Sequence, residues 1–182
     1  MLQLRSKLRR DLLGYFFTNP DAEHYLRELA ALLHADAANL SRELAALAQL
    51  GIFQWRLRGR LKFYRLNRAH PLFEEYRRII SKTIGVEGQL RRLFASMPGI
   101  QQAYLFGSFA SNRQDSQSDI DVLLVGSPDP EKLASEVRKL EKRLARAINY
   151  TLLSKSEFQT RRKKRDAFLL DALRHKVDLM AA

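Results

Sequence analysis

The stretch that decides the fold runs from Tyr104 to Val125 and reads YLFGSFASNRQDSQSDIDVLLV. An apolar run leads into Gly107-Ser108, and a polar loop follows from Ser111 to Ser118. A second apolar run begins at Asp119-Ile120-Asp121. Apolar runs on both sides of a Gly-Ser turn and a polar loop predict two neighbouring strands joined by that loop.

The two acids at the start of the second strand are the candidate chemical groups. Residues two apart in a strand lie on one face, so Asp119 and Asp121 should project together while Ile120 points into the core. Adjacent carboxylates repel each other unless a cation lies between them, and hard oxygen ligands suit Mg²⁺ or Mn²⁺. The alternative is that Ser118-Asp119 starts a strand after a turn and that both acids are solvated.

The whole pattern resembles the nucleotidyltransferase superfamily that includes DNA polymerase beta, in particular its minimal nucleotidyltransferases. The resemblance covers about residues 86 to 180, and the matching residues are Gly107, Ser108, Ala110, Ser118, Asp119 and Asp121. It implies that Gly107 and Ser108 contact the triphosphate of a nucleotide. It also implies that Asp119 and Asp121 are catalytic and bind Mg²⁺ or Mn²⁺.

The resemblance also implies a third carboxylate on the next long strand, and this chain lacks it. The strand expected from Ile148 to Leu153 contains no acid, and Asn149 or Thr151 stands where the carboxylate would be. A neutral amide offers an oxygen ligand but neither negative charge nor a proton acceptor. We therefore expect binding of a metal–nucleotide complex and weak or absent transfer.

Composition sets limits on the class of protein. The chain has 182 residues, a net charge of +12 and no cysteine, which excludes disulfides and cysteine-based zinc sites. No apolar run approaches the ~20 residues that span a bilayer, and the charged N-terminus lacks a secretion signal. These features predict a cytoplasmic protein without a membrane partner. Basic clusters at Arg56–Arg68 and Arg161–Arg165 are typical of phosphate binding, although a solvated charged face explains the second equally well.

The N-terminal part predicts three helices and a hairpin. Helical spacing of apolar residues covers residues 2–17, 22–33 and 37–50, and alternating segments at 52–57 and 61–66 flank a basic tip. Asp36 is the expected N-cap of the third helix, and Gly51 should end it. The order, and the string RELAALLHADAANLSRELAALAQLGIF, is similar to winged helix-turn-helix regulators of the ArsR-like type over about residues 10 to 68.

This resemblance implies contacts with double-stranded DNA. On the third helix the candidate base-reading residues lie opposite the apolar side, and they are Asn39, Ser41 and Arg42. On the hairpin the candidate phosphate-binding residues are Arg56, Arg58, Arg60 and Lys62. Arg42 could instead pair with Glu43 or Glu28. The aromatic residues Trp55, Phe63 and Tyr64 are interpreted as ordinary packing of the hairpin against the third helix.

The predicted organisation is therefore α+β. An N-terminal winged helix-turn-helix domain (1–70) is followed by a linker helix (71–88) and a small mixed-sheet nucleotidyltransferase-like domain (89–182). In the last domain we expect strands at 100–106 and 148–153, helices at 131–147 and 166–173, a helix around Phe158, and an edge strand at 176–180.

Two functional hypotheses follow. The first is a DNA-binding transcriptional regulator, expected to be a homodimer that reads two half-sites. Its second domain would sense a nucleotide, mediate assembly or retain weak transferase activity. The second is an active nucleotidyltransferase that modifies a protein, an RNA or a small molecule, in the manner of an antitoxin beside a toxin-like partner protein. A third interpretation makes the hairpin and the Arg161–Arg165 run an RNA-binding surface.

Overall fold

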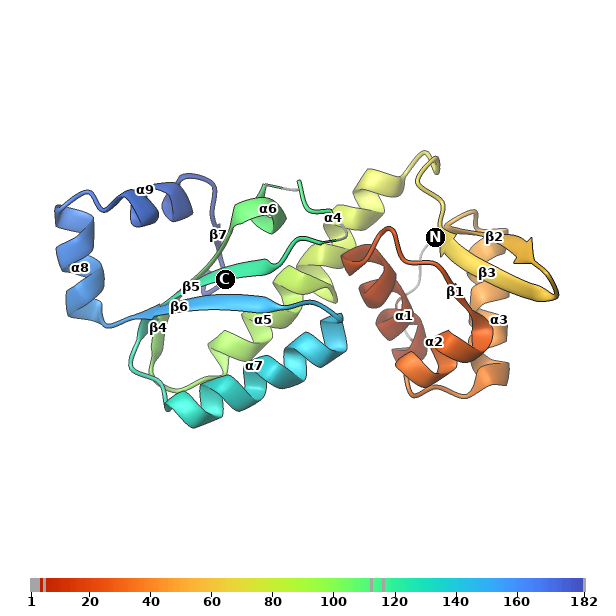
Figure 1. Cartoon of the computed structure of the whole chain (residues 1–182), viewed down its shortest axis with the longest axis horizontal. Coiled ribbons are helices and arrows are strands. Elements are labelled where there is room, and N and C mark those ends of the chain that lie inside the picture. Colours follow the sequence, from red (N-terminus) through yellow and green to blue (C-terminus); the bar gives the residue numbers. More distant parts are fainter. Residues whose placement is uncertain (1–3, 5, 112, 116, 182) are drawn as a thin grey trace. The chain divides into compact units, whose positions relative to one another are not determined.

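The chain divides into two compact units, Met1–Val86 and Glu87–Ala182. The computed structural model describes residues 4, 6–111, 113–115 and 117–181 (Figure 1). The division falls inside the segment 71–88, which the sequence predicts to be a linker. Among the described residues, no helix combines the length and the apolar character that crossing a bilayer requires.

The helices of unit 1, in the part that the structure describes, are α1 (Lys7–Thr18), α2 (Leu26–Leu32), α3 (Ala37–Gln49) and α4 (Phe73–Thr83). Asp36 caps α3 as predicted, because its carboxylate accepts a 2.9 Å hydrogen bond from the backbone N–H of Asn39. Gly51 follows the helix as expected. Residues 2, 3 and 5 of the first predicted helix lie outside the described residues.

A three-stranded antiparallel sheet completes unit 1. Its order is β1 (His24–Tyr25), β3 (Leu61–Leu66), β2 (Phe53–Arg58), so β3 is central. The β2–β3 hairpin is confirmed, and its tip is the two-residue turn Gly59-Arg60. Gly59 has φ +60° whereas Arg60 has no positive φ, which fits a type II′ turn with glycine first.

The helix predicted from Ala22 to Leu33 begins later than expected. His24 and Tyr25 form the edge strand β1 on β3, and α2 starts at Leu26. The carboxylate of Glu28 accepts a 3.2 Å hydrogen bond from the backbone N–H of Tyr25, which fixes the start of the helix. The prediction failed because β1 exists only through pairing with a strand some 40 residues later in the chain.

The core of unit 1 includes the helix that the sequence assigns to a linker. In α4, Ile80 is fully buried and Phe73 stacks on Phe17 of α1 with ring centres 5.6 Å apart. Leu72, just before this helix, and Ile79 within it stay exposed. The other buried apolar residues of this core are Leu12, Leu13, Tyr15, Phe16, Leu29, Leu40, Leu44, Leu47, Ile52, Phe53 and Leu66.

Unit 2 is built on a four-stranded mixed sheet with the order β6-β5-β4-β7. The strands are β4 (Ile100–Phe106), β5 (Ile120–Gly126), β6 (Ile148–Leu153) and β7 (Val177–Asp178). Only the β5–β6 pair is parallel. The helices are α5 (Val86–Ala95), α6 (Gly107–Ala110), α7 (Pro130–Leu144), α8 (Lys155–Lys163) and α9 (Ala167–Arg174). The predicted α+β class with a mixed sheet is confirmed.

Helices cover both faces of this sheet (Figure 1). On one face, Phe158 of α8 and Leu169 of α9 pack on Tyr104, Leu123 and Val125. On the other face lie α5 and α7, whose inward residues include Leu90, Phe94, Leu133, Val137, Leu140 and Leu144. Because β5 is buried on both faces, Asp121 is the place where a charge breaks an otherwise apolar strand.

Candidate functional site

The candidate site lies where β4 ends and β5 begins. Phe106 pairs with Asp121 in the antiparallel register, so the residue after Phe106 comes close to that carboxylate. Gly107 has φ +71°, and a Cβ added to it would lie 2.6 Å from Asp121 Oδ2. Both the left-handed backbone and this close approach require glycine. The Gly107-Ser108 turn and the second acid thus form one local structure.

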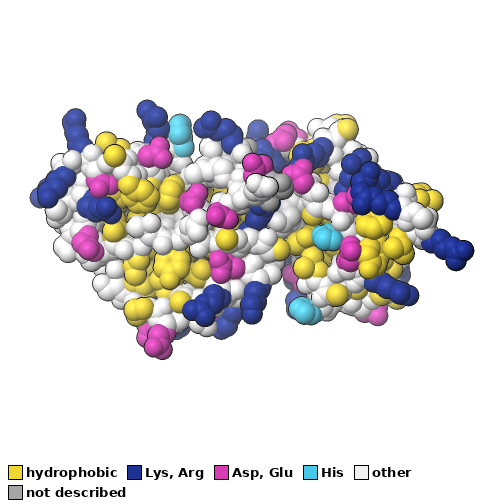
Figure 2. Space-filling model, viewed as in Figure 1, with side chains coloured by type: hydrophobic (Ala, Val, Ile, Leu, Met, Phe, Trp, Pro, Cys, Tyr) yellow, Lys and Arg dark blue, Asp and Glu magenta, His cyan; other side chains and the backbone are white. Residues whose placement is uncertain are grey.

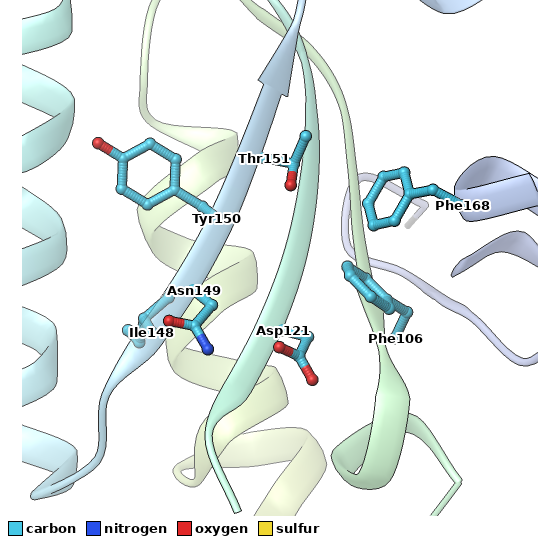
Figure 3. A pocket seen from close by; sticks show the side chains of 7 residues that line it. All are labelled: Phe106, Asp121, Ile148, Asn149, Tyr150, Thr151 and Phe168. Atoms are coloured by element: carbon cyan, nitrogen blue, oxygen red, sulfur yellow. The ribbon is translucent and has the colours of Figure 1, made fainter. Parts of the chain in front are cut away.

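A third polar residue, Asn149 on β6, completes the cluster (Figure 3). Asp121 pairs with Asn149 in the parallel register, and Asn149 Nδ2 donates a 3.1 Å hydrogen bond to Asp119 Oδ2. Thr151 pairs with Leu123, one step farther along the strand. Of the two candidates for the missing third position, Asn149 is therefore the residue in contact with the acids.

The electrostatics of the cluster favour a cation. Burial raises the pKa of the Asp121 carboxyl, the hydrogen bond from Asn149 lowers it, and the negative charge of Asp119 raises it again. A divalent cation between the acids would remove this repulsion. Two carboxylates and an amide oxygen fit one Mg²⁺ that keeps several waters, because Mg²⁺ sites in proteins seldom use a full set of side chains.

Among the described residues, no cluster of three or more His, Cys, Asp or Glu suits a metal.

The loop that carries Asp119 is held from the turn after α7. Arg146, which is buried, donates a 3.1 Å hydrogen bond from Nη1 to the carbonyl of Ser118. Ile120 N–H donates to the carbonyl of Ala147 at 2.9 Å. The hydroxyl of Ser118 donates to Asp115 at 2.8 Å, so it serves the turn rather than the acids. These contacts hold the loop before β5 against the turn that leads into β6.

A pocket of about 440 Å³ opens beside the acids (Figure 3). Asp121 and Asn149 supply its polar side, and Phe106 and Phe168 supply an aromatic side. The two phenyl rings meet edge to face with centres 5.8 Å apart. Sequence reasoning missed Phe168, because α9 lies more than 40 residues beyond the motif and no local pattern marks the residue.

A sequence model described as "Polymerase beta, Nucleotidyltransferase" matches residues 88–180 of this chain. The matched segment contains the turn, both acids and β6. The chain belongs to this family. Its match begins after unit 1, so residues 1–87 lie outside the part that the nucleotidyltransferase model describes.

Solved structures of similar proteins were also found. A toxin–antitoxin structure with AMP-PNP is 20% identical, with a TM-score of 0.40 over 53% of this chain and 73% of that one. A mutant of the toxin–antitoxin MntA-HpeT is 19% identical, with a TM-score of 0.37 over 52% and 69%. A putative nucleotidyltransferase from Sulfolobus solfataricus is 24% identical, with a TM-score of 0.28 over 51% and 74%. Among curated proteins, no sequence matches.

The candidate DNA-reading residues lie in the part of the chain outside the nucleotidyltransferase match. Asn39, Ser41 and Arg42 are exposed on α3, and Arg42 donates to the side-chain oxygen of Asn39. The predicted alternative pairing of Arg42 with Glu43 or Glu28 is wrong. Arg9 of α1 donates to Glu43 at 2.7 Å, and Glu28 bonds the start of α2.

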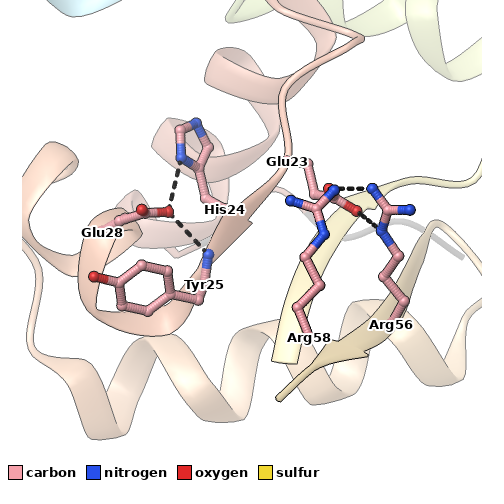
Figure 4. A network of polar contacts seen from close by, with 6 residues as sticks. All are labelled: Glu23, His24, Tyr25, Glu28, Arg56 and Arg58. Atoms are coloured by element: carbon pink, nitrogen blue, oxygen red, sulfur yellow. Dashed lines mark hydrogen bonds and ion pairs between the residues drawn. The ribbon is translucent and has the colours of Figure 1, made fainter. Parts of the chain in front are cut away.

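On the hairpin, two arginines share one acid (Figure 4). Arg56 Nη2 lies 2.6 Å from Glu23 Oε2, and Arg58 binds the same carboxylate oxygen. The hydrogen bond from Arg56 holds the pKa of Glu23 below its ordinary value of 4.5, although burial opposes this. Arg60 lies at the exposed tip, and Lys62 Nζ lies 4.4 Å from the ring centre of Trp55. Sequence reasoning missed Glu23, because 33 residues separate it from Arg56.

The aromatic residues of the hairpin have three different environments. Tyr64 packs against the core of unit 1, as expected for structural packing. Phe63 contacts Tyr25 of β1, with ring centres 5.5 Å apart, and Trp55 is 48% exposed. Trp55 pairs with Tyr64 and therefore shares its face of the hairpin, whereas Phe63 pairs with Arg56 on the opposite face, so packing on the third helix stays a prediction for Trp55. Each of the two rings has a cation on its own face of the hairpin, Lys62 over Trp55 and Arg58 over Phe63.

Proposed function

We propose that residues 89–182 form a nucleotidyltransferase domain that binds a nucleoside triphosphate with Mg²⁺ or Mn²⁺ and transfers a nucleotide slowly. The observation that carries this proposal is the close approach of Gly107 to Asp121, beside Asp119. Asp119 and Asp121 would hold the metal, and Gly107 and Ser108 would meet the triphosphate. When bound, the cation neutralises phosphate charge and polarises the reacting phosphoryl group.

Slow transfer follows from the residue on β6. Asn149 supplies an amide where a carboxylate would add negative charge and accept a proton from the attacking hydroxyl. Proton transfer by a positioned base contributes typically ~10²–10⁴-fold to a rate. The domain is thus expected to retain binding and to lose most of the rate.

Titration of a fluorescent ATP analogue with Mg²⁺ tests the binding half. Wild type should bind, whereas Asp119→Ala/Asp121→Ala should lose at least tenfold in affinity. The matched control is Glu131→Ala/Asp171→Ala, which removes two exposed acids from α7 and α9 and should bind as wild type does. Equal affinity in all three proteins would contradict the proposal.

Incubation with labelled ATP tests the transfer half. Acceptors from three classes are supplied, namely a partner protein encoded beside this chain, RNA, and small molecules with free hydroxyls. We expect slow label transfer to one class, abolished in Asp119→Ala/Asp121→Ala. Binding without transfer to any class would leave a nucleotide-sensing domain and would contradict the catalytic half.

For unit 1 we infer a second function, binding of duplex DNA by a winged helix-turn-helix domain in residues 1–70. The supporting observation is that α3 presents Asn39, Ser41 and Arg42 to solvent while the hairpin presents Arg56, Arg58, Arg60 and Lys62. A helix of this kind reads base edges, and a basic wing neutralises phosphates. A DNA site made of two half-sites would be bound by a homodimer, with one protomer on each half-site. The family comparison gives no support for this function, so the nucleotidyltransferase proposal stands first.

Mobility shifts with the chain's own upstream DNA test the second function. Arg58→Ala/Arg60→Ala/Lys62→Ala should weaken binding to all sequences and reduce the salt slope by about three. Asn39→Ala/Ser41→Ala should instead reduce the preference for the upstream site over unrelated DNA. Binding that is insensitive to salt and to both variants would refute a DNA-binding unit 1. Sedimentation with and without the duplex gives the oligomeric state.

A further inference from the structure

The cations of α8 and α9 form a surface outside the site described above, although Phe168 of α9 also lines its pocket. Residues 155–176 contain eight Lys and Arg against three acids, a net charge of +5. Two of the three acids cap helices, since Glu157 closes the capping box of α8 and Asp166 caps α9. Figure 2 shows Lys and Arg side chains gathered at the end of the molecule where Figure 1 places α8. The exposed cations are Lys155, Arg162, Lys163, Lys164, Arg165, Arg174 and Lys176.

The backbone at the end of α8 holds one of these cations in a strained position. Arg165 has φ +52°, in the left-handed region where glycine usually ends a helix. Backbone hydrogen bonds fix it there, from Arg165 N–H to the Arg162 carbonyl at 3.2 Å and from Asp166 N–H to the Arg161 carbonyl at 3.0 Å. The turn that ends α8 thus keeps Arg165 exposed beside the other cations of the helix.

The cations extend to the sheet face that carries the pocket. Lys176 Nζ lies 4.0 Å from the ring centre of Tyr104 on β4. Burial and Asp178 raise the pKa of the Tyr104 hydroxyl, and Arg162 lowers it, so positive charge from α8 also acts at this ring. Two residues along the same strand face, Phe106 meets Phe168, which is 37% exposed. Cations and exposed aromatic rings therefore occur on one side of unit 2.

We propose that the surface formed by α8 and α9 binds the backbone of a single-stranded nucleic acid, with a base against Phe168. Cations that follow a phosphate backbone, together with rings on which bases stack, are the features of single-strand binding. A duplex would keep its bases away from Phe168. An anionic membrane is a poorer fit for α8, where most of the cations lie, because Phe158, its apolar side chain, is buried in the core; the exposed apolar side chains Phe168 and Leu170 belong to α9. If the proposed transferase activity holds, the acceptor belongs to the same class.

Fluorescence anisotropy of a labelled RNA oligonucleotide of about 20 nucleotides tests the proposal on the full chain, without metal or nucleotide. Arg162→Glu/Lys163→Glu/Lys164→Glu should lose at least tenfold in affinity at about 0.1 M salt. Its salt slope should fall by about two. The matched control on α7 is Lys132→Glu/Arg138→Glu/Lys142→Glu, which makes the same charge change on exposed residues and should lose less than threefold. Phe168→Ala should weaken RNA binding about fivefold and leave the salt slope unchanged.

Equal losses in the α7 and α8 variants would overturn the proposal, since binding would then follow net charge alone. Tighter binding of the matched duplex than of the single strand would also overturn it, as would an α8 defect seen only with anionic lipid vesicles. Circular dichroism melts verify that every variant folds. Asp119→Ala/Asp121→Ala should bind RNA like wild type, so failure of this surface and failure of the metal–nucleotide site give different results.

Discussion

The side-chain amide of Asn149 donates a 3.1 Å hydrogen bond to Asp119 Oδ2, across the parallel pair β5 and β6. This amide is neutral, so the contact adds no negative charge beside Asp119 and Asp121. Asn149 thus holds the two acids together and at the same time withholds the third negative charge. Four predictions follow, which concern Asn149, Gly107 and the carboxylate of Glu23.

Asn149→Asp should supply the missing carboxylate. We expect Mg²⁺ or Mn²⁺ to bind roughly tenfold more tightly, equivalent to about 1.4 kcal/mol, and label transfer from ATP to increase by at least that factor. Isothermal titration with each metal measures the first effect. Thr151→Asp is the control, because it adds the same charge to the same face beside Leu123. If both variants behave alike, the special position of Asn149 is disproved.

Gly107→Ala should destabilise unit 2 and damage the site together. The methyl group would lie 2.6 Å from Asp121 Oδ2 on a backbone with φ +71°, so we expect a loss of about 2–3 kcal/mol and weaker metal binding. Gly59→Ala is a useful comparison, because Gly59 also has a positive φ and its Cβ would meet no atom within 4 Å. Its cost should stay near 1 kcal/mol. If denaturant titration gives the same loss of unfolding free energy for Gly107→Ala and Gly59→Ala, the contact with Asp121 is unimportant.

Glu23→Gln should strengthen DNA binding by unit 1. The change releases Arg56 and Arg58 from the carboxylate that both now bind, and it leaves their charge available for phosphates. We expect about three- to tenfold tighter binding and a steeper salt dependence. Asp21→Asn also removes one acid nearby, but it frees Arg68 instead. A similar gain in both variants would show that net charge, not the release of the hairpin arginines, controls affinity.

The carboxylate of Glu23 should also make the thermal stability of unit 1 depend on pH. Chiefly through the hydrogen bond from Arg56, the pKa of Glu23 lies below its ordinary value of 4.5. A depressed acid pKa means that the pair stabilises the fold above about pH 4.5, and that this contribution is lost as the pH falls through the folded value. Wild type should melt about 2 °C above Glu23→Gln near pH 7, a small shift because the arginines are half exposed. The two curves should converge in acid, and a gap that widens there would contradict the assignment.

The sequence predicted well those elements whose signals are local. The end of β4, the Gly107 turn and the start of β5 are encoded by adjacent apolar runs, a glycine and a polar loop. Asp36 and Gly51 likewise marked the ends of α3. Interactions between distant segments could not be read in this way. The pairing of β1 with β3, the joint binding of Arg56 and Arg58 by Glu23, and the burial of Ile80 depend on packing that no short window contains.

The ambiguity between Asn149 and Thr151 had the same origin. Both residues lie on one face of β6, and the choice between them depends on the register of β6 against β5. The turn after α7 leads into β6 and contacts the loop before β5, through the hydrogen bond from Arg146 to the Ser118 carbonyl. Phe168 reaches the pocket from α9, which is separated from β6 by α8. Which residues of β6 and α9 line the site therefore depends on contacts between distant segments and not on residue type alone.

The identity of residue 149 also has a consequence for how this domain can change over generations. The codons for asparagine and aspartate differ at a single base, and the backbone at this position already pairs with Asp121. One point mutation would therefore supply the third acid without any rearrangement of the strand. Under the proposed function, this single genetic step would turn a domain that binds the metal–nucleotide complex into one that also transfers the nucleotide efficiently.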